Sequence, residues 1–255
     1  MQASWLLKAV ASHGLEAPTA VQQLATPAAL CGKDVLALAE TGSGKTLAYG
    51  WPALAHCCAQ RRCCKGEGCV ALVLCPTREL SEQIYRELSK YARFFPSSSG
   101  SRGPLSTVAV FGGAGKWEMA KALGAGADLV VATPGRLIEL VGSGCTDLHS
   151  RCTFVVVDEA DRMFDMGFAE QLRCLLQRVR PKRQTLLCTA TLAPKLDALA
   201  RSALRDPVRI VVGRAGKAFV ANDAVHQSAH VLPNAAAKFS KTSQRCIMGT
   251  TLFET

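Results

Sequence analysis

The stretch from Asp34 to Thr46, DVLALAETGSGKT, constrains the fold of this chain more than any other part of the sequence. It begins with four apolar residues, Val35 to Leu38, which predict a short buried strand. Leu47 and the residues that follow predict a helix. Between them lies the pattern A-x4-G-K-T, which differs from the strict phosphate-binding pattern G-x4-G-K-[ST] only in Ala39. A strand, a glycine-rich turn and a helix in this order predict a phosphate-binding loop, or P-loop.

The residues of this loop suit the binding of a nucleoside triphosphate. Gly42 and Gly44 allow the backbone to curl and to turn its N–H groups towards a phosphate. The start of the next helix adds a positive partial charge. Lys45 can reach the β- and γ-phosphates, and the Thr46 hydroxyl can coordinate Mg²⁺. We therefore predict that ATP and Mg²⁺ are bound here, by Ala39, Glu40, Thr41, Gly42, Ser43, Gly44, Lys45 and Thr46.

Apolar runs and helical periodicities alternate along the rest of the chain. Further strands are predicted at 70–75, 107–111, 129–132, 154–157, 185–188 and 208–212, and helices at 5–13, 80–91, 116–123, 168–179 and 194–204. The helix after the P-loop, residues 47–57, is expected to break at Pro52. This alternation predicts an α/β fold with one parallel sheet that is covered by helices on both faces.

Two adjacent acids, Asp158 and Glu159, follow the apolar run Phe154 to Val157. Ligands of parallel sheets gather at the carboxyl ends of the strands, so these acids are expected to lie beside the P-loop. Asp158 is predicted to anchor Mg²⁺. Glu159 is placed to take a proton from the attacking water as a general base. Together with Lys45, they are the candidate catalytic residues.

The charge of the chain indicates its class of partner. The formal net charge is +10, from 30 Lys and Arg against 20 Asp and Glu. This excess favours a polyanionic partner such as nucleic acid, with a generally basic protein as the alternative. No run approaches the ~18 apolar residues that a membrane-spanning helix needs, and the N-terminus does not match a secretory signal. We therefore expect neither membrane association nor secretion.

The twelve cysteines show no regular disulfide spacing, so free thiols are expected in a reducing compartment. Five of them crowd the stretch 57–69, at Cys57, Cys58, Cys63, Cys64 and Cys69. Their spacing is not a standard zinc-binding spacing. We interpret this stretch as a cysteine-rich surface loop, with metal binding as the alternative.

The ordered motifs AETGSGKT, PTREL, GG, TPGR and DEAD resemble those of the DEAD-box RNA helicases, and Pro18 to Gln22 resembles their adenine-sensing Q motif. DEADRMFDMGF at 158–168 and GG-x3-WE-x-AKAL at 112–123 are most similar to a subgroup that includes nuclear helicases associated with splicing. The resemblance extends over roughly residues 5–239. It implies a RecA-like ATP-binding domain over 24–213, preceded by an N-terminal helix and Q-motif region over 1–23.

The resemblance also implies roles for individual residues. Gln22 would read adenine, although Leu15 stands where the family usually has an aromatic residue, which weakens adenine stacking. Asp161, Thr189, Ala190 and Thr191 would couple the nucleotide site to domain movement, with Thr189 in place of the family's usual serine. RNA would be gripped by its phosphate backbone, without reading of sequence, by Pro76, Thr77, Arg78, Gly112, Gly113, Thr133, Pro134, Gly135 and Arg136.

The function implied is that of an ATP-dependent RNA helicase, with no preference for DNA. A ribonucleoprotein complex is the expected setting, in the nucleus, with the cytoplasm as the alternative. Family members continue into a second RecA-like domain that supplies arginine fingers, whereas the resemblance here fades after Phe239. We expect that second domain to be absent and 214–255 to be a poorly ordered tail. The alternative function is therefore a truncated ATP- and RNA-binding module with little turnover of its own.

Overall fold

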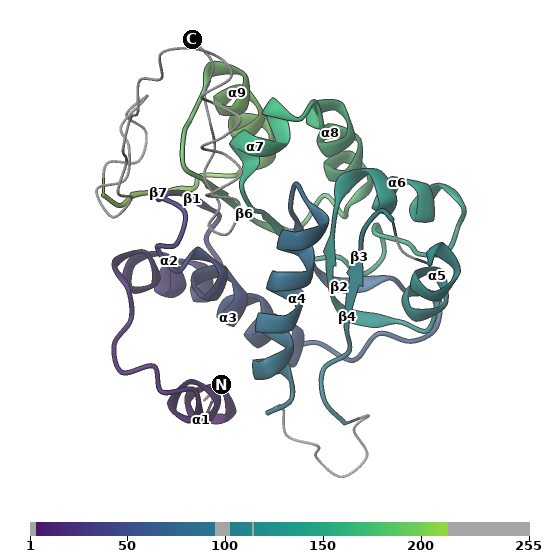
Figure 1. The fold of residues 1–255 in the computed structure, drawn as a ribbon, viewed down its shortest axis with the longest axis horizontal. Helices are drawn as coiled ribbons and strands as arrows, with labels where there is room; N and C mark the ends of the chain where they lie inside the picture. The colour runs from purple at the N-terminus through teal and green to yellow at the C-terminus, as the bar shows by residue number, and fades with distance from the viewer. Residues whose placement is uncertain (1–3, 95–102, 114, 214–255) are drawn as a thin grey trace, which may run out of the picture. The chain divides into compact units, whose positions relative to one another are not determined.

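The computed structural model describes residues 4–94, 103–113 and 115–213. Within these ranges seven strands form one parallel sheet in the order β3-β4-β2-β5-β6-β1-β7 (Figure 1). The predicted α/β class with a parallel sheet is confirmed. The strands are β1 (Val35–Leu38), β2 (Cys69–Leu74), β3 (Thr107–Val110), β4 (Ala127–Ala132), β5 (Phe154–Val157), β6 (Gln184–Thr189) and β7 (Val208–Val211).

The helices of the described part cover both faces of this sheet. The buried side chains accordingly form two clusters, one on each face. One cluster packs against α1 to α4 and the other against α5 to α9. The helices are α1 (Ser4–Ser12), α2 (Ala20–Leu30), α3 (Lys45–Cys58), α4 (Arg78–Ala92), α5 (Lys116–Gly124), α6 (Pro134–Gly142), α7 (Ala160–Asp165), α8 (Ala169–Arg178) and α9 (Pro194–Ala203).

Successive residues of the central strands enter opposite clusters. In β1, Val35 and Ala37 belong to the cluster beneath α1 to α4, whereas Leu36 and Leu38 belong to the other one. This is the expected alternation of side chains along a strand. Because both faces are covered, β1 is apolar at every position, which explains why its sequence shows a continuous apolar run instead of an alternating pattern.

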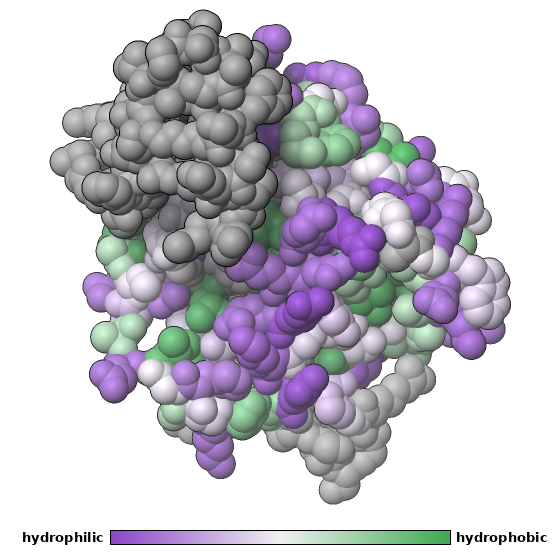
Figure 2. Space-filling view, in the orientation of Figure 1, coloured by the Kyte–Doolittle hydropathy of each residue, from purple (hydrophilic) through white to green (hydrophobic). Residues whose placement is uncertain are grey.

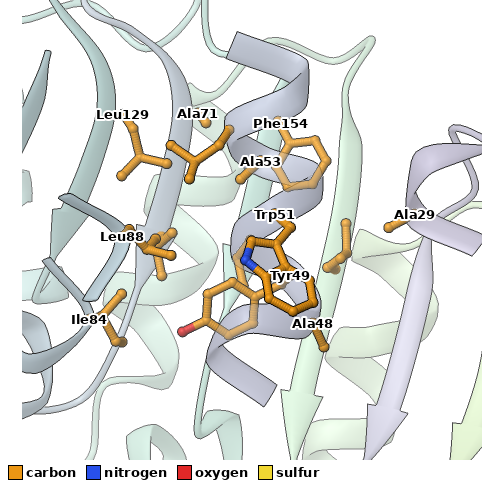
Figure 3. Packing of buried hydrophobic residues seen from close by; sticks show 14 of the residues in the cluster. Ala29, Ala48, Tyr49, Trp51, Ala53, Ala71, Ile84, Leu88, Leu129 and Phe154 are labelled. Atoms are coloured by element: carbon orange, nitrogen blue, oxygen red, sulfur yellow. The ribbon is translucent and has the colours of Figure 1, made fainter. Parts of the chain in front are cut away.

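Helices α3 and α4 pack closely on the face of the sheet that α1 to α4 cover (Figure 3), and hydrophilic residues gather on the outer side of α4 (Figure 2). Tyr49 and Trp51 of α3 lie in the same cluster as Ile84 and Leu88 of α4. A Cβ atom built on Gly50 would collide with the side chain of Leu88. The absence of a side chain at Gly50 therefore permits this close approach, and it brings the start of α3 into a fixed position at the edge of the sheet.

The predicted break of the P-loop helix at Pro52 is wrong, because α3 runs without interruption from Lys45 to Cys58. A proline has no N–H group and leaves the carbonyl four residues earlier without its helical donor. Here that carbonyl belongs to Ala48, and it accepts a hydrogen bond of 3.2 Å from the hydroxyl of Thr26 in α2. A donor from a neighbouring helix thus replaces the bond that Pro52 removes.

The prediction of a surface loop for the cysteine-rich stretch is also wrong in part. Cys57 belongs to α3, Cys69 belongs to β2, and both are buried together with Cys63. The buried carboxylate of Asp128 draws this segment inwards, because it accepts a hydrogen bond from the Cys63 N–H and pairs with Arg62 at 2.7 Å. Burial raises the pKa of the Cys57 thiol well above its usual value.

No cysteine within the described residues is joined in a disulfide bond, as expected. In the same residues no three His, Cys, Asp or Glu side chains are placed to hold a metal ion. None of the helices that the structure describes has the length and apolar character needed to span a membrane. The predicted tail, residues 214–255, lies outside the described residues and stays a prediction.

Candidate nucleotide and RNA site

Six polar motifs follow six strands at one edge of the sheet. The P-loop follows β1, and the motifs PTREL, GG, TPGR, DEAD and Thr189-Ala190-Thr191 follow or end β2, β3, β4, β5 and β6. All of these strands are parallel, so their carboxyl ends meet at the same edge. The structure therefore brings the predicted site residues together, although they come from segments far apart in the sequence.

The P-loop wraps around the side chain of Lys45. Its Nζ donates hydrogen bonds to the carbonyl oxygens of Ala39, at 2.7 Å, and Glu40, at 2.8 Å. Gly42 and Gly44 have φ angles of +83° and +92°, which favour glycine. Ala39 is not among the described residues with positive φ. Its backbone therefore tolerates an alanine in place of the first glycine of the strict pattern.

Gln22 lies directly against the P-loop. Its amide oxygen accepts a hydrogen bond of 3.0 Å from the Thr19 N–H, and its amide nitrogen donates one of 3.2 Å to the Gly44 carbonyl. A Cβ atom on Gly44 would lie 2.7 Å from that amide nitrogen. The structure thus places Gln22 beside the nucleotide loop. To contact adenine, the amide group must give up these two hydrogen bonds, and the role of Gln22 in reading adenine stays a prediction.

The carboxylate of Asp158 is buried at the tip of β5. One oxygen accepts a hydrogen bond of 2.8 Å from the Tyr49 hydroxyl, and the other accepts one of 3.0 Å from the Glu159 N–H. Burial raises the pKa of Asp158 to about 6, although the Tyr49 hydrogen bond and the charge of Lys45 act in the opposite direction. Burial raises the pKa of Tyr49 well above its usual value, and the Thr46 side chain acts in the opposite direction. The two predicted metal-binding residues therefore lie around the same tyrosine.

Tyr49 is a site residue that sequence reasoning missed. Its ring is buried in the core beneath α3, so its sequence position indicates only a buried helical residue. Its hydroxyl is nevertheless the donor that satisfies a buried carboxylate. The sequence does contain one signal for this role. A tyrosine stands three residues after the P-loop threonine, at a buried position that an apolar residue could fill.

We expect Tyr49→Phe to lower the free energy of unfolding by about 1–3 kcal/mol, because a buried carboxylate oxygen loses its donor while the ring remains. Urea denaturation followed by circular dichroism measures this change. Tyr85→Phe is the matched control, since Tyr85 is a partly buried tyrosine of α4 that packs against the same core. Equal denaturation midpoints for the two variants would show that the hydrogen bond from Tyr49 to Asp158 does not contribute to the free energy of unfolding.

Glu159 has a backbone conformation that is unusual for a residue with a side chain. Its φ and ψ are both 50°, in the left-handed region, and such a conformation costs on the order of 1–3 kcal/mol. The carboxylate is largely buried and pairs with Arg162 at 3.2 Å. Strain of this kind persists where surrounding contacts hold it and clusters at functional sites. The backbone thus holds Glu159 at the strand tip, beside Asp158.

The residues predicted to couple the nucleotide site to movement are joined by hydrogen bonds. One oxygen of Asp161 accepts from the N–H of Ala190, at 3.2 Å, and from the N–H and hydroxyl of Thr191, at 2.9 and 3.0 Å. Thr189 donates its hydroxyl to the Thr191 carbonyl, at 2.7 Å. The Ala39 N–H donates to the Thr189 carbonyl, at 3.0 Å. The DEAD motif, the end of β6 and the P-loop therefore form one connected structure.

A groove of about 450 Å³ lies at the same edge and contains most of the predicted RNA-binding residues. Gly113 adjoins it through its carbonyl, which accepts a bond of 3.4 Å from Arg78, and Pro134 begins α6. Sequence reasoning missed four lining residues, Glu79, Glu139, Met166 and Phe168. The predicted residues that line the groove are Pro76, Thr77, Arg78, Gly112, Thr133, Gly135 and Arg136.

The two arginines of the groove are held by neighbouring groups. Arg78 pairs with Glu82 at 3.0 Å, and its guanidinium lies 5.0 Å from the centre of the Phe111 ring. Arg136 lies 3.7 Å from Glu139, and its buried Nε has no hydrogen-bond partner among the described atoms. A buried donor without a partner is uncommon and is satisfied when an acceptor binds. Phosphate oxygens are acceptors that suit arginine.

A glycine-rich loop between β1 and α3 lies at the same edge of a parallel sheet as two acids that follow β5, with β6 between these two strands. This arrangement defines a RecA-like P-loop domain. The profile of the family described as DEAD/DEAH box helicase matches residues 19–199. The chain belongs to this family.

The curated relatives have matching names. The chain is 44% identical over 230 residues to the ATP-dependent RNA helicase DDX42 of Gallus gallus, which covers 90% of this chain and 23% of that protein. It is 43% identical over 233 residues to the DEAD-box ATP-dependent RNA helicase 24 of Oryza sativa subsp. japonica, which covers 91% of this chain and 29% of that protein. The chain thus spans less than a third of the length of these relatives.

Solved structures of the same family share the fold. The yeast DEAD-box splicing factor Prp28 superposes with a TM-score of 0.75 at 30% identity, over 95% of this chain and 56% of that one. A hypothetical ATP-dependent RNA helicase from Sulfolobus tokodaii superposes with a TM-score of 0.72 at 31% identity, over 83% of this chain and 57% of that one. These similarities agree with the predicted RecA-like domain.

Proposed function

We propose that this chain acts as the ATP-binding RecA-like domain of an ATP-dependent RNA helicase. The observation that carries the proposal is the shared sheet edge, where the P-loop around Lys45 and the arginine-containing groove are held on one parallel sheet. The names of the relatives, which are ATP-dependent RNA helicases, support it. ATP would bind at the P-loop, and RNA would bind in the groove.

The residues present fit a triphosphate with Mg²⁺. Lys45 is buried and, among the residues that the structure describes, donates to the loop carbonyls of Ala39 and Glu40, so its ammonium group can turn from these carbonyls to phosphate oxygens. Thr46 and Asp158 offer hard oxygen donors of the kind that Mg²⁺ prefers. We propose that Thr46 binds the ion directly and Asp158 through water. When bound, the ion neutralises charge on the phosphates.

Glu159 is the proposed general base for water attack on the γ-phosphate. Its carboxylate lies beside Asp158 at the strand tip, and Arg162 holds it from the solvent side at 3.2 Å. A carboxylate in this position can orient a water molecule and accept its proton. Asp161, two residues further along the chain, accepts hydrogen bonds from Ala190 and Thr191, so the same short segment serves both turnover and coupling.

Turnover in this family also requires positive charge on the γ-phosphate in the transition state. The resemblance assigns that charge to arginine fingers of a second RecA-like domain, whereas the described residues form a single sheet. An arginine finger contributes on the order of 10³–10⁵ in rate. We therefore expect a polypeptide of these residues to bind ATP and to hydrolyse it slowly. This behaviour is that of the alternative function, an ATP- and RNA-binding module with little turnover of its own. A second RecA-like domain added in trans should raise the rate.

The proposed partner is RNA, contacted mainly through its phosphates, with no preference for DNA and no membrane. A solved structure with the same fold is described as a splicing factor, which supports a ribonucleoprotein complex as the setting. A nuclear location follows from that proposal, with the cytoplasm as the alternative. A fluorescent fusion would test it, and exclusion from nuclei would contradict it.

We expect Arg136→Ala to weaken RNA binding about equally for all sequences, because the lost contact is to phosphate. The slope of log affinity against log salt should become shallower by about one unit. Anisotropy of labelled single-stranded RNA, measured from low to moderate salt, gives both quantities. Arg201→Ala is the control, since Arg201 pairs with Asp197 on the exposed surface of α9. A slope unchanged by Arg136→Ala, or strong sequence preference in the unmodified chain, would contradict the assignment.

A further inference from the structure

Helix α5 exposes a large aromatic side chain that the site described above does not use. Trp117 is 73% exposed, in contrast to Met119 and Leu123 of the same helix, which are buried in the core. The Nζ atom of Lys121 lies 5.4 Å from the centre of the Trp117 ring. An aromatic face flanked by a cation is suited to stacking against a base of a nucleic acid.

The first turn of α5 lies at the rim of the RNA groove. Lys116 lies 3.6 Å from a carboxylate oxygen of Glu139, and Arg136 lies 3.7 Å from the same oxygen. Glu139 and Arg136 both line the groove. One carboxylate therefore joins α5 to the arginine that is proposed to bind RNA, and Trp117 is the next residue after Lys116.

The direction of the side chains along α5 places Trp117 and Lys121 on one exposed face. With about 100° per residue in an α-helix, Trp117 and Lys121 lie about 100° and 140° from Lys116 around the axis. Met119 and Leu123 lie on the other side of Lys116, where they enter the core. Trp117 and Lys121 thus lie within about 40° of one another, on a side of the helix turned away from the core.

We propose that Trp117 is a stacking platform for a base of single-stranded RNA at the rim of the groove, with Lys116 and Lys121 binding adjacent phosphates. The proposal rests on the proposed RNA-binding function and adds a contact to a base where the groove contacts only the backbone. Base stacking on an aromatic ring tolerates any sequence. The lysines that flank the ring favour a polyanion over an apolar protein partner.

The test compares two oligonucleotides of equal length, one of oligouridylate and one with the same backbone and abasic positions. Trp117→Ala should weaken binding of the base-bearing strand by about fivefold or more and leave the abasic strand unchanged. Trp117→Phe, which keeps an aromatic face, should retain most of the affinity. Leu30→Ala is the control, because Leu30 is an exposed apolar residue at the end of α2 and should change neither affinity.

Two results would overturn the inference while leaving RNA binding intact. One is an unchanged affinity of Trp117→Ala for the base-bearing strand, which would mean that the ring does not contact the RNA. The other is an equal loss for both strands, which would mean that the ring supports the backbone site instead of a base. If the unmodified chain binds neither strand at low salt, the proposed RNA-binding function itself fails.

Discussion

Replacing Lys45 by alanine is expected to abolish ATP binding by the chain. The Lys45 ammonium group is buried inside the loop and is the charge that would turn to the β- and γ-phosphates. Its loss removes two or more charge-assisted hydrogen bonds, so we expect affinity to fall at least about 100-fold. Isothermal titration with a non-hydrolysable ATP analogue and Mg²⁺ measures this loss.

The matched control is Lys33→Ala, because Lys33 is an exposed lysine that contacts Asp206 at 3.6 Å on the surface. That variant should bind the analogue with unchanged affinity. Since Lys45 also holds the carbonyls of Ala39 and Glu40, thermal unfolding of the Lys45 variant must be recorded beside the titration. A folded Lys45→Ala chain that binds the analogue as tightly as the unmodified chain would remove the basis for the nucleotide site.

Replacing Glu159 by glutamine is expected to separate binding from turnover. Glutamine has nearly the same shape as glutamate and can remain near Arg162, but it cannot accept the proton of the attacking water. Loss of a general base lowers rates by about 10²–10⁴. We expect phosphate release to fall within that range while affinity for the ATP analogue stays within about twofold, because Lys45 provides the phosphate contacts.

Glu170→Gln is the control for this substitution, because Glu170 is an exposed acid of α8 that pairs with Arg173 away from the strand tips. Phosphate release is measured with RNA present and a second RecA-like domain in trans, where the rate is expected to be highest. Equal rates for Glu159→Gln and the unmodified chain would assign proton transfer to another group. Loss of ATP affinity in Glu159→Gln would instead show a structural role.

Much of the fold could be predicted because its signals are local. The apolar runs of the central strands are buried on both faces, and this burial makes them continuous and easy to recognise. The P-loop could be predicted for a similar reason. Gly42 and Gly44 have positive φ angles, which favour glycine, so the conformation of the loop is visible in its residue types. Both signals lie within a few neighbouring residues.

The features that sequence reasoning missed depend on distant partners. Pro52 does not break α3, because Thr26 donates to the freed carbonyl of Ala48. The burial of Cys63 depends on Asp128, which follows far along the chain in β4. The short helix α7 has too few turns to show a periodicity. No pattern among neighbouring residues predicts any of these three arrangements.

The same distinction applies to the site. The identity of Asp158 and Glu159 could be predicted from two acids after a buried run, but the hydroxyl that Tyr49 supplies to Asp158 comes from a different helix. The groove was predicted through its motifs, whereas Met166 and Phe168 reach it from the segment after α7. These two residues stand within the motif at 158–168, but their contact with the groove depends on packing, which the motif alone does not show.

The most direct test of the proposed function is phosphate release from ATP measured while single-stranded RNA is titrated, with a second RecA-like domain present in trans. We predict that the rate rises with RNA and saturates, because the groove and the P-loop share one sheet edge. Helix α7, whose Asp161 bonds to Ala190 and Thr191, also leads into the groove residues Met166 and Phe168. A rate that is substantial but indifferent to RNA would contradict the proposal that this domain couples ATP to RNA.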